Sequence, residues 1–470
     1  MSIFGFENKA EFTKKLNEHI SASGPVKSIQ QLFGREKELC LIEEALYANG
    51  RHVFIYGDRG VGKSSLAAAA AAQYQSPDNS PIQVGCGPDT KFYETIENLV
   101  DRVMKSLAGK FEHTVTQTIN IKIYSINWKN TAKKVEIVKV DSMYSAVNAA
   151  EEISKYHSEN PVIIIDEFDQ IDSETERKLF ATFLKDLGDR GVNVKFIFTG
   201  VATSLEKLLG SHESSFRQLH TIGLERLGWS AREDIVREAA AAFSLSVDDE
   251  VCFTVAKISN GFPYYAHLIM EKLLWLAFNN EQNISHLDIN LFNLALEDAI
   301  SSIGAHLKHP YEQATSHRSP DYTEILWATS DSEDIIRYGE GIFLSYLRIH
   351  EKLHGKNPSP ERLPLPQPNF LAKLRDLKKK QYGGIIETAL DRKGLYTYRE
   401  NILRGFIAMK ALEGGVELQG NVPDAPKIPT ALAKARRPTS AGKGSMPNIK
   451  FRGEEKPSLE LGDYTDSGSS

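Results

Sequence analysis

The sequence predicts an α/β fold with a parallel sheet, followed by an all-helical segment and a C-terminal winged helix-turn-helix. Two apolar, β-branched runs, Val53–Tyr56 and Pro161–Asp166, have the composition of strands that are covered on both faces of a parallel sheet. Helix-forming segments such as Ser65–Gln73 and Met143–His157 lie between these runs, which is the alternation expected of βα units. Because the chain has 470 residues, it is too long for one core and should contain several domains.

Bulk properties exclude several classes of protein. The net charge of −6 argues against a uniformly basic nucleic-acid binder, so any contact with DNA requires a local basic patch. The three cysteines, Cys40, Cys86 and Cys252, stand singly and predict free thiols, without a disulfide framework or a cysteine zinc site. The sequence contains no run of about 18 apolar residues and no signal pattern, which predicts a cytoplasmic protein without membrane contact.

The stretch Arg51–Leu66 carries a phosphate-binding pattern between a strand and a helix. Residues Gly57–Ser64, called here the phosphate loop, read GDRGVGKS and match G-x-x-x-x-G-K-[ST]. The glycines let backbone N–H groups surround phosphate oxygens, and the helix N-terminus adds partial positive charge. We expect Lys63 to reach the β- and γ-phosphates and the Ser64 hydroxyl to ligate Mg²⁺. The predicted nucleotide ligands are Gly57, Asp58, Arg59, Gly60, Val61, Gly62, Lys63, Ser64 and Ser65.

An acidic pair follows the second buried run. Asp166 and Glu167 stand at the carboxyl end of this strand, where α/β sheets place their ligands. Such a pair is often only a helix N-cap, but after a phosphate loop it predicts chemistry. Asp166 would hold the Mg²⁺ water shell, and Glu167 would polarise the attacking water as a general base. The next predicted strand, Val192–Gly200, ends with Thr199, which either reaches the γ-phosphate and that water or is a common strand-end residue.

Two further positions carry weaker signals. Arg217 precedes the apolar run Leu219–Leu224, where a guanidinium could reach the γ-phosphate bound to a neighbouring subunit. The alternative for Arg217 is a surface ion pair with Glu213. Pro263 lies at the start of a helix in the mostly helical stretch Trp229–Phe278, and either simply begins that helix or belongs to a turn that touches the adenine.

The region between the first strands and the acidic pair contains an insertion. Residues 113–140 alternate Thr, Ile, Val and Lys around a central Asn-Trp-Lys-Asn, which predicts a β-hairpin. This hairpin is either decoration or a contact for DNA or a partner through its lysines.

A basic helix and two strands mark the C-terminal part of the chain. The helix Asn369–Lys380 is followed by the strands Gly384–Thr388 and Leu395–Tyr398, with a basic turn between them, which suggests a winged helix-turn-helix. A solvated face or a protein-docking module fits the same charges. Duplex DNA would be contacted by Lys373, Arg375, Lys378, Lys379, Lys380, Arg392 and Lys393. Residues 419–470 are too polar to form a core and should be disordered.

The expected domains are an N-terminal arm (1–30), a nucleotide-binding core (31–226, with the hairpin at 113–140), a helical lid (227–310), a winged-helix domain (311–418) and a disordered tail (419–470).

Taken in order, these motifs resemble an AAA+ P-loop ATPase of the branch that joins origin-recognition-type initiators and STAND-type ATPases. The resemblance covers about Leu32–Leu412 and implies ATP as the nucleotide. It places Gly34 and Arg35 near the adenine, and it implies that Asp166 and Glu167 are the Walker B pair and Thr199 the γ-phosphate sensor.

One departure concerns the helix that starts at Pro263. Initiators usually carry an arginine three residues after the glycine of this turn, where this sequence has Tyr264, and His267 is the nearby basic candidate. Gly261-Phe262-Pro263 is similar instead to the STAND-type Gly-x-Pro turn.

The resemblance implies a slow ATPase that acts as a switch. ATP would close the lid, Arg217 would couple closure to assembly of a homo-oligomer, and the winged helix would hold DNA. The alternative is a nucleotide-gated scaffold that binds a partner protein with little turnover. The intact Glu167 favours hydrolysis, whereas the missing lid arginine favours the scaffold.

Overall fold

The computed structural model describes residues 6, 8–22, 24, 26, 31–75, 80–110, 120–121, 124–129, 132–137, 139–201, 218–280 and 284–418. All of them belong to one compact unit, Met1–Pro426. Arg217 and the tail predicted at 419–470 lie outside the described residues. None of the described helices is both long enough and apolar enough to cross a membrane.

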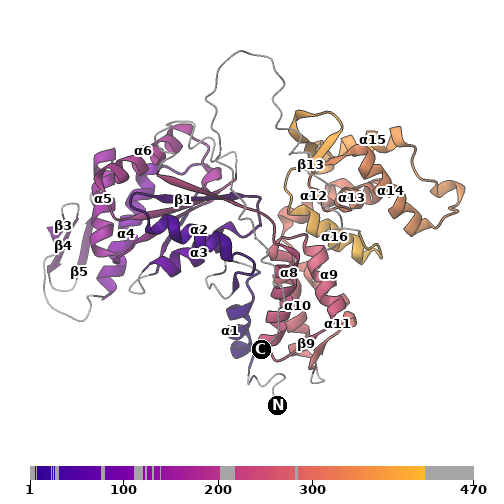
Figure 1. Cartoon of the computed structure of the whole chain (residues 1–470), viewed down its shortest axis with the longest axis horizontal. Coiled ribbons are helices and arrows are strands. Elements are labelled where there is room, and N and C mark those ends of the chain that lie inside the picture. Colours follow the sequence, from indigo (N-terminus) through magenta and orange to yellow (C-terminus); the bar gives the residue numbers. More distant parts are fainter. Residues whose placement is uncertain are drawn as a thin grey trace, which may run out of the picture. The chain divides into compact units, whose positions relative to one another are not determined.

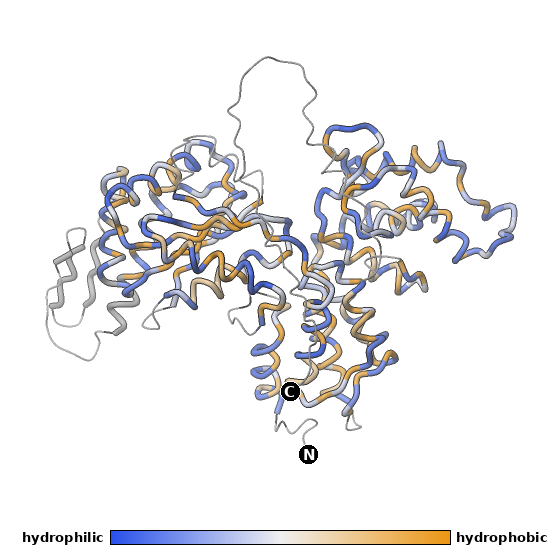
Figure 2. Tube along the Cα trace, in the orientation of Figure 1, coloured by the Kyte–Doolittle hydropathy of each residue, from blue (hydrophilic) through white to orange (hydrophobic). Residues whose placement is uncertain are grey.

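A five-stranded parallel sheet forms the centre of the N-terminal part, in the order β2-β6-β7-β1-β8 (Figure 1). Every residue of β6 and β7 is buried, which explains the apolar runs Val162–Ile165 and Phe196–Phe198 within them. Figure 2 shows the same strands as a hydrophobic band. The predicted α/β fold with a parallel sheet is therefore confirmed. The strands are β1 (His52–Gly57), β2 (Ile82–Gly85), β6 (Val162–Asp166), β7 (Lys195–Gly200) and β8 (Leu219–Leu224).

Helices cover both faces of this sheet. Successive β1 side chains point to opposite faces, so Phe54 belongs to one hydrophobic cluster and Val53 and Ile55 to another. The Phe54 cluster includes side chains of α4 (Phe92–Lys110), α5 (Met143–Tyr156) and α6 (Glu174–Arg190). The other cluster includes α2 (Glu36–Tyr47) and α3 (Lys63–Tyr74).

The inserted region contains the predicted hairpin and one more short strand. Strands β4 (Tyr124–Lys129) and β5 (Ala132–Ile137) pair antiparallel, and β3 (Asn120–Ile121) pairs with β4. These three strands form a sheet of their own that is separate from the central sheet.

The lid is mostly, but not entirely, helical. Between its helices, β9 (Ser246–Val247) and β10 (His286–Leu287) form a short parallel pair, so the all-helical prediction is wrong at this point. Two backbone hydrogen bonds join these two strands and their flanking residues. The Ser246 N–H donates to the Ser285 carbonyl, and the Asp248 N–H donates to the Leu287 carbonyl. The lid helices are α8 (Trp229–Ala242), α9 (Asp249–Ser259), α10 (Pro263–Asn279) and α11 (Ile289–Ser302).

The N-terminal helix α1 (Lys9–His19) packs on the lid. Phe12 of α1 stacks on Phe278, with ring centroids 4.2 Å apart, and also contacts Phe243 and Trp275. The arm thus contacts lid helices that come more than two hundred residues later in the sequence.

The C-terminal segment combines five helices with a three-stranded antiparallel sheet of order β11-β13-β12. Its basic helix ends at Asp376, before the predicted end at Lys380, and the chain turns where Gly383 and Gly384 both adopt positive φ. The elements are α12 (Ala305–Thr315), α13 (Asp321–Ser330), β11 (Arg337–Tyr338), α14 (Gly339–His354), α15 (Gln367–Asp376), β12 (Ile386–Thr388), β13 (Leu395–Tyr398) and α16 (Leu403–Glu413).

Candidate nucleotide-binding site

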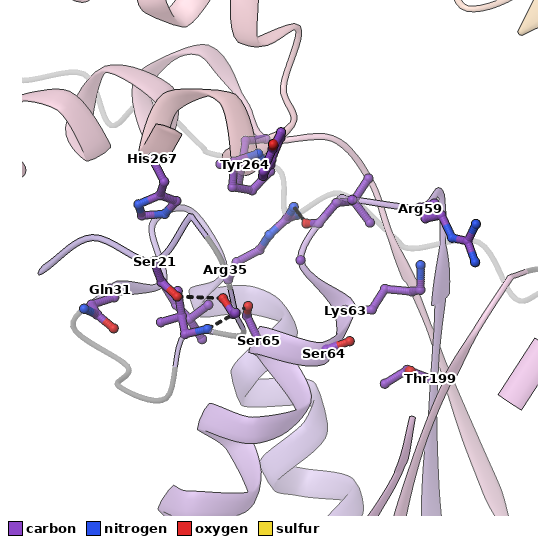
Figure 3. A pocket seen from close by; sticks show the side chains of 18 of the residues that line it. Ser21, Gln31, Arg35, Arg59, Lys63, Ser64, Ser65, Thr199, Tyr264 and His267 are labelled. Atoms are coloured by element: carbon purple, nitrogen blue, oxygen red, sulfur yellow. Dashed lines mark hydrogen bonds between the residues drawn. The ribbon is translucent and has the colours of Figure 1, made fainter. Parts of the chain in front are cut away.

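A pocket of about 520 Å³ lies at the carboxyl ends of β1, β6 and β7 (Figure 3). Strand β7 pairs with β1 on one side and with β6 on the other, so the residues that follow these strands converge. The phosphate loop follows β1, Asp166 is the last residue of β6 and is followed by Glu167, and Thr199 is the next-to-last residue of β7. The structure therefore brings these predicted residues together around one pocket.

The phosphate loop has the backbone shape that its glycines permit. Gly60 and Gly62 adopt φ values of 84° and 98°, and Gly62 precedes the first turn of α3. Lys63 donates from Nζ to the carbonyl oxygens of Gly57 and Asp58, at 3.1 and 2.8 Å. Burial lowers the pKa of Lys63, an effect that the nearby Asp169 opposes. To reach a phosphate, as the sequence predicts, the ammonium would have to leave these two carbonyl oxygens.

The Asp166 carboxylate accepts hydrogen bonds from several side chains in this pocket. One carboxylate oxygen accepts hydrogen bonds from the Ser64 hydroxyl, at 2.8 Å, and from the Thr199 hydroxyl. The other accepts from the Gln83 side-chain amide at 2.9 Å. Neighbouring oxygens in an octahedral Mg²⁺ shell lie about 3.0 Å apart, given metal–oxygen distances near 2.1 Å. The spacing of Ser64 and Asp166 thus fits one metal ion.

Thr199 has a second contact that fixes Glu167. Its hydroxyl oxygen accepts the backbone N–H of Glu167 at 3.1 Å while it donates to Asp166. In this structure the hydroxyl therefore positions the acidic pair, and the predicted contact with a γ-phosphate would require it to turn. Glu167 itself is exposed and has a φ of 55°, an uncommon conformation for a residue other than glycine and one often found at functional sites.

Arg35 lines the pocket, as predicted, whereas Gly34 lies just outside it. Arg35 donates from Nη2 to the carbonyl oxygens of Val61 and Glu225, at 3.0 and 2.7 Å, and so joins the phosphate loop to the end of β8. Burial lowers the pKa of this guanidinium. Gly34 does not line the pocket; a Cβ there would lie 2.7 Å from Cβ of Ala231, so glycine is needed for α8 to approach.

Several pocket residues were not anticipated from the sequence. Gln83 holds Asp166, although glutamine in a short strand carries no motif. The arm contributes Ser21 and Val26, and Val26 donates its N–H to the Ser65 hydroxyl at 3.0 Å. Pro263, which was predicted, lines the pocket at the first position of α10. No sequence pattern near either segment predicts that the arm contacts the phosphate loop.

The lid supplies a neutral imidazole to the pocket. His267 and Tyr264 both line the pocket. His267 is 3% exposed, and burial lowers its pKa to about 4, so the ring is uncharged near pH 7. His267, the basic candidate predicted near Tyr264, therefore brings no positive charge to the pocket near pH 7.

Acidification is expected to destabilise the fold through His267. Between about pH 6.5 and pH 4 the unfolded chain binds a proton at this ring that the folded chain does not, so stability falls as the pH drops through this window. The lowered pKa of His267 corresponds to a loss of at most about 3 kcal/mol in the free energy of unfolding. Urea denaturation at pH 7.5 and pH 4.5 measures how much the free energy of unfolding decreases on acidification. This decrease should be smaller for His267→Leu than for wild type. The exposed His306→Gln should lose as much as wild type, and equal losses in all three proteins would contradict the assignment.

A distant part of the chain contacts the phosphate loop. The Asn401 side-chain amide donates to the Asp58 carboxylate at 2.9 Å, and Arg59 lies 3.6 Å from Glu400. A Cβ at Gly60 would lie 2.5 Å from Cδ1 of Ile402. Residues 400–402, called here the latch, therefore rest on the tip of the loop.

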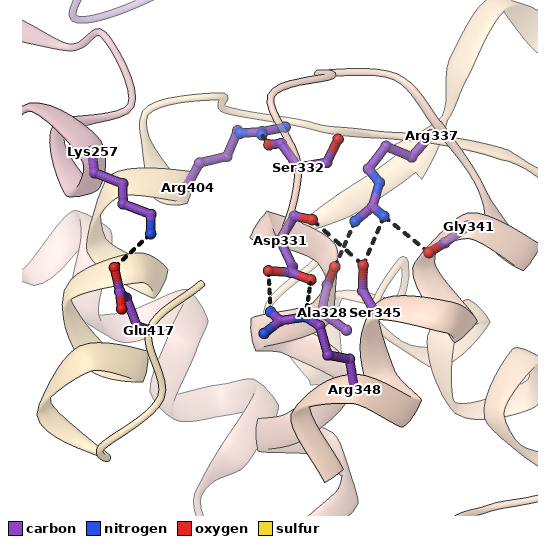
Figure 4. Close-up of polar contacts among 10 residues, drawn as sticks. All are labelled: Lys257, Ala328, Asp331, Ser332, Arg337, Gly341, Ser345, Arg348, Arg404 and Glu417. Atoms are coloured by element: carbon purple, nitrogen blue, oxygen red, sulfur yellow. Dashed lines mark hydrogen bonds and ion pairs between the residues drawn. The ribbon is translucent and has the colours of Figure 1, made fainter. Parts of the chain in front are cut away.

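The latch is held by the lid and by the start of α16. Tyr265 of α10 donates its hydroxyl to the carbonyl of Ile402 at 2.6 Å. Arg404 is fully buried and donates to Oδ1 of Asn260, at 3.2 Å, and to the carbonyls of Ser332 and Asp334. Figure 4 shows Arg404 beside Ser332. The latch is thus part of a continuous contact between the phosphate loop, the lid and the C-terminal segment.

A second set of polar contacts lies next to Arg404 in the same view. Lys257 of the lid pairs with Glu417 at 2.6 Å, and Asp331 pairs with Arg348 within the C-terminal segment. The lid and the C-terminal segment are therefore joined by both buried and exposed groups.

Solved structures with similar folds come from archaea and bacteria. The Walker-type ATPase of Pyrococcus abyssi is 17% identical with a TM-score of 0.49, and the match covers 82% of this chain and 98% of that one. The ORC2 protein of Aeropyrum pernix is 12% identical with a TM-score of 0.45, covering 85% and 98%. The RuvB Holliday junction branch migration motor of Thermotoga maritima is 13% identical with a TM-score of 0.40, covering 83% and 98%.

The comparison with curated proteins gave no match. A protein-family model does match the part of the chain that contains the phosphate loop and the acidic pair. Residues 31–197 match the family described as an AAA ATPase domain.

Proposed function

We propose that this chain is an AAA+ ATPase that binds ATP with Mg²⁺, hydrolyses it slowly and uses the nucleotide as a conformational switch. The observation that carries the proposal is the 2.8 Å contact between the Ser64 hydroxyl and the Asp166 carboxylate, within a pocket that also contains Lys63 and Glu167. The match of residues 31–197 to an AAA ATPase domain supports it. Loss of ATP turnover in Glu167→Gln, with ATP binding kept, tests it.

The residues divide the work of hydrolysis. Bound Mg²⁺ would neutralise charge on the phosphates and would be held by Ser64 and Asp166. Lys63 would leave the loop carbonyls for the β- and γ-phosphates. Glu167 is exposed at the edge of the pocket, where its carboxylate can orient and polarise a water molecule. The uncharged His267 leaves the lid without a cation at its position, which supports slow turnover.

The latch supports the switch. Asp58 and Gly60 belong to the loop that would surround the phosphates, and both contact residues of the latch. A nucleotide that alters the loop would change these contacts, and a partner that moved the C-terminal segment would change nucleotide affinity by the same coupling. Assembly through Arg217 into a homo-oligomer is part of this proposal.

The C-terminal segment is proposed to be a winged helix that contacts duplex DNA. Its three-stranded antiparallel sheet and its helices support this assignment. The seven predicted contact residues differ in their surroundings. Lys373 pairs with Asp321 at 3.2 Å, Lys379 pairs with Asp376 at 2.7 Å, and Lys378 donates to the Thr388 hydroxyl. The remaining four are exposed: Arg375, Lys380, Arg392 and Lys393.

Neutralising Arg375, Lys380, Arg392 and Lys393, which form no ion pair among the described residues, should weaken DNA binding more than neutralising two residues that do, although Lys379 of that pair is itself exposed. The Arg375→Gln, Lys380→Gln, Arg392→Gln and Lys393→Gln variant should lower the slope of log affinity against log salt by up to about 3 to 4 units, because about 0.9 counterion is released per phosphate contact. Fluorescence anisotropy with a labelled duplex measures this slope. The Lys373→Gln, Lys379→Gln variant is the matched control and should change it by less than half as much. Equal slopes in all proteins would contradict the DNA assignment.

The internal pairing of Lys373, Lys378 and Lys379 favours a second candidate, a nucleotide-gated scaffold whose C-terminal segment binds a partner protein. Wild-type protein that binds no duplex at low salt, and that turns over no ATP above the Glu167→Gln background, would favour this candidate.

A further inference from the structure

Three side chains with metal-binding atoms meet in the C-terminal segment, apart from the nucleotide pocket. Nδ1 of His350 lies 2.7 Å from one carboxylate oxygen of Glu324, and Nε2 of His354 lies 2.9 Å from the other. One ligand atom from each of the three residues can be chosen so that all lie within 4.8 Å of one another. Glu324 and His350 are buried, and His354 is mostly buried.

Two packed helices create this cluster. His350 and His354 are four residues apart on α14, so their side chains lie on one face, with ring centroids 4.5 Å apart. Glu324 comes from α13, which packs against α14. The ligand set is therefore held by helices and not by a loop.

His350 is oriented by a backbone group. Its Nε2 lies 2.7 Å from the carbonyl oxygen of Arg362, which can only accept a hydrogen bond, so Nε2 carries a hydrogen. Nδ1 then faces the Glu324 carboxylate, and these two acceptor atoms need either a shared proton or a metal cation between them. Histidine ligands of metals are commonly oriented in this way, by a hydrogen bond from the nitrogen that does not bind the metal.

We propose that Glu324, His350 and His354 bind a divalent transition-metal ion of the Zn²⁺ type. Two imidazoles and one carboxylate are a ligand set that Zn²⁺ accepts, with water completing a tetrahedron. Ligand atoms about 2.0–2.1 Å from a tetrahedral ion lie roughly 3.3 Å from one another. The 2.7 and 2.9 Å separations are to different carboxylate oxygens, so one of these oxygens would bind the ion with the two ring nitrogens, and the three ligand atoms already lie within 4.8 Å of one another.

The bound ion joins three parts of the C-terminal segment. It links α13 to the end of α14, and His350 extends the link to the turn at Pro360–Arg362 through the Arg362 carbonyl. The sequence His350-Glu351-Lys352-Leu353-His354 has the spacing of hydrolytic zinc sites. Glu351 is exposed, however, and its side chain has no hydrogen bond or ion pair among those described, so the ion is assigned a structural role.

Metal binding by the full, tag-free chain tests the site independently of ATP turnover. Chelator-treated protein is titrated with Zn²⁺ against a chromophoric competitor, and with Co²⁺ to record the visible bands of tetrahedral coordination. Wild type should bind one Zn²⁺ tightly and display these bands. His354→Gln and Glu324→Gln should each weaken binding at least about 100-fold, because each removes one of three ligands. The exposed His306→Gln is the matched control and should bind as wild type does.

Two variants are used because Glu324 is more deeply buried than His354, and circular dichroism should show that each is folded. Wild-type protein without a tight site or without the Co²⁺ bands would overturn the proposal. A site that survives in both folded variants would also overturn it. The cluster would then be a set of hydrogen bonds between Glu324 and the two histidines.

Discussion

Replacing Glu167 with glutamine is expected to lower ATP turnover by about 100- to 10,000-fold while ATP affinity changes little. The substitution keeps the size of the side chain and removes the carboxylate that would polarise the water. The backbone at this position is held by the Thr199 hydroxyl and does not depend on the Glu167 side chain. Phosphate release under saturating ATP measures turnover, and titration with a fluorescent ATP analogue measures affinity.

Two other variants serve as comparisons for the turnover and affinity of Glu167→Gln. Asp172→Asn removes an exposed carboxylate five residues away that does not line the pocket, and it should turn over ATP as wild type does. Lys63→Ala should lose affinity for ATP as well as turnover. Among the described residues that line the pocket, Lys63 is the only lysine, so the variant removes the ammonium that would bind the phosphates. If wild type and Glu167→Gln release phosphate at the same rate, Glu167 is not the general base and the scaffold candidate gains support.

The sheet could be predicted because each strand has a recognisable pattern within its own few residues. Strands β6 and β7 are buried on both faces, so each contains an apolar run, Val162–Ile165 in β6 and Phe196–Phe198 in β7. The phosphate loop is also local, since its glycines and Lys63 lie within eight consecutive residues. Parallel topology then places Asp166 and Thr199 near that loop without any further signal.

Other features depend on contacts that leave no local pattern. Asn401 reaches Asp58 across 343 positions of sequence, and neither residue type is unusual where it stands. The pocket residue Gln83 is polar in a strand where any half-buried residue would fit. The Glu324, His350 and His354 cluster did leave a signal, since two histidines four residues apart on a helix share a face. Its third member could be found only once α13 and α14 were packed together.

The latch is built so that one neutral hydrogen-bond donor faces one carboxylate. Asn401 donates from Nδ2 to Asp58, and its Oδ1 is buried without a hydrogen-bond partner among the described residues. The nearby pair of Arg59 and Glu400 is largely exposed, at 53% and 39%, so water and salt weaken it. The Asn401 contact should therefore dominate the hold of the latch on the phosphate loop.

Replacing Asn401 with aspartate is expected to release the latch and to speed dissociation of bound nucleotide by about 10- to 100-fold. The donor is lost and a second carboxylate faces Asp58, and a hydrogen bond to a charged group contributes about 1.5–3 kcal/mol. Stopped-flow release of a fluorescent ATP analogue into excess ATP measures the rate, and Asn401→Ala should give a smaller increase. Glu400→Gln, which breaks only the exposed pair, should change the rate less than twofold. If Asn401→Asp releases nucleotide at the wild-type rate, the latch does not control the pocket, and the C-terminal segment must be coupled to ATP by the buried contacts of Arg404 or not at all.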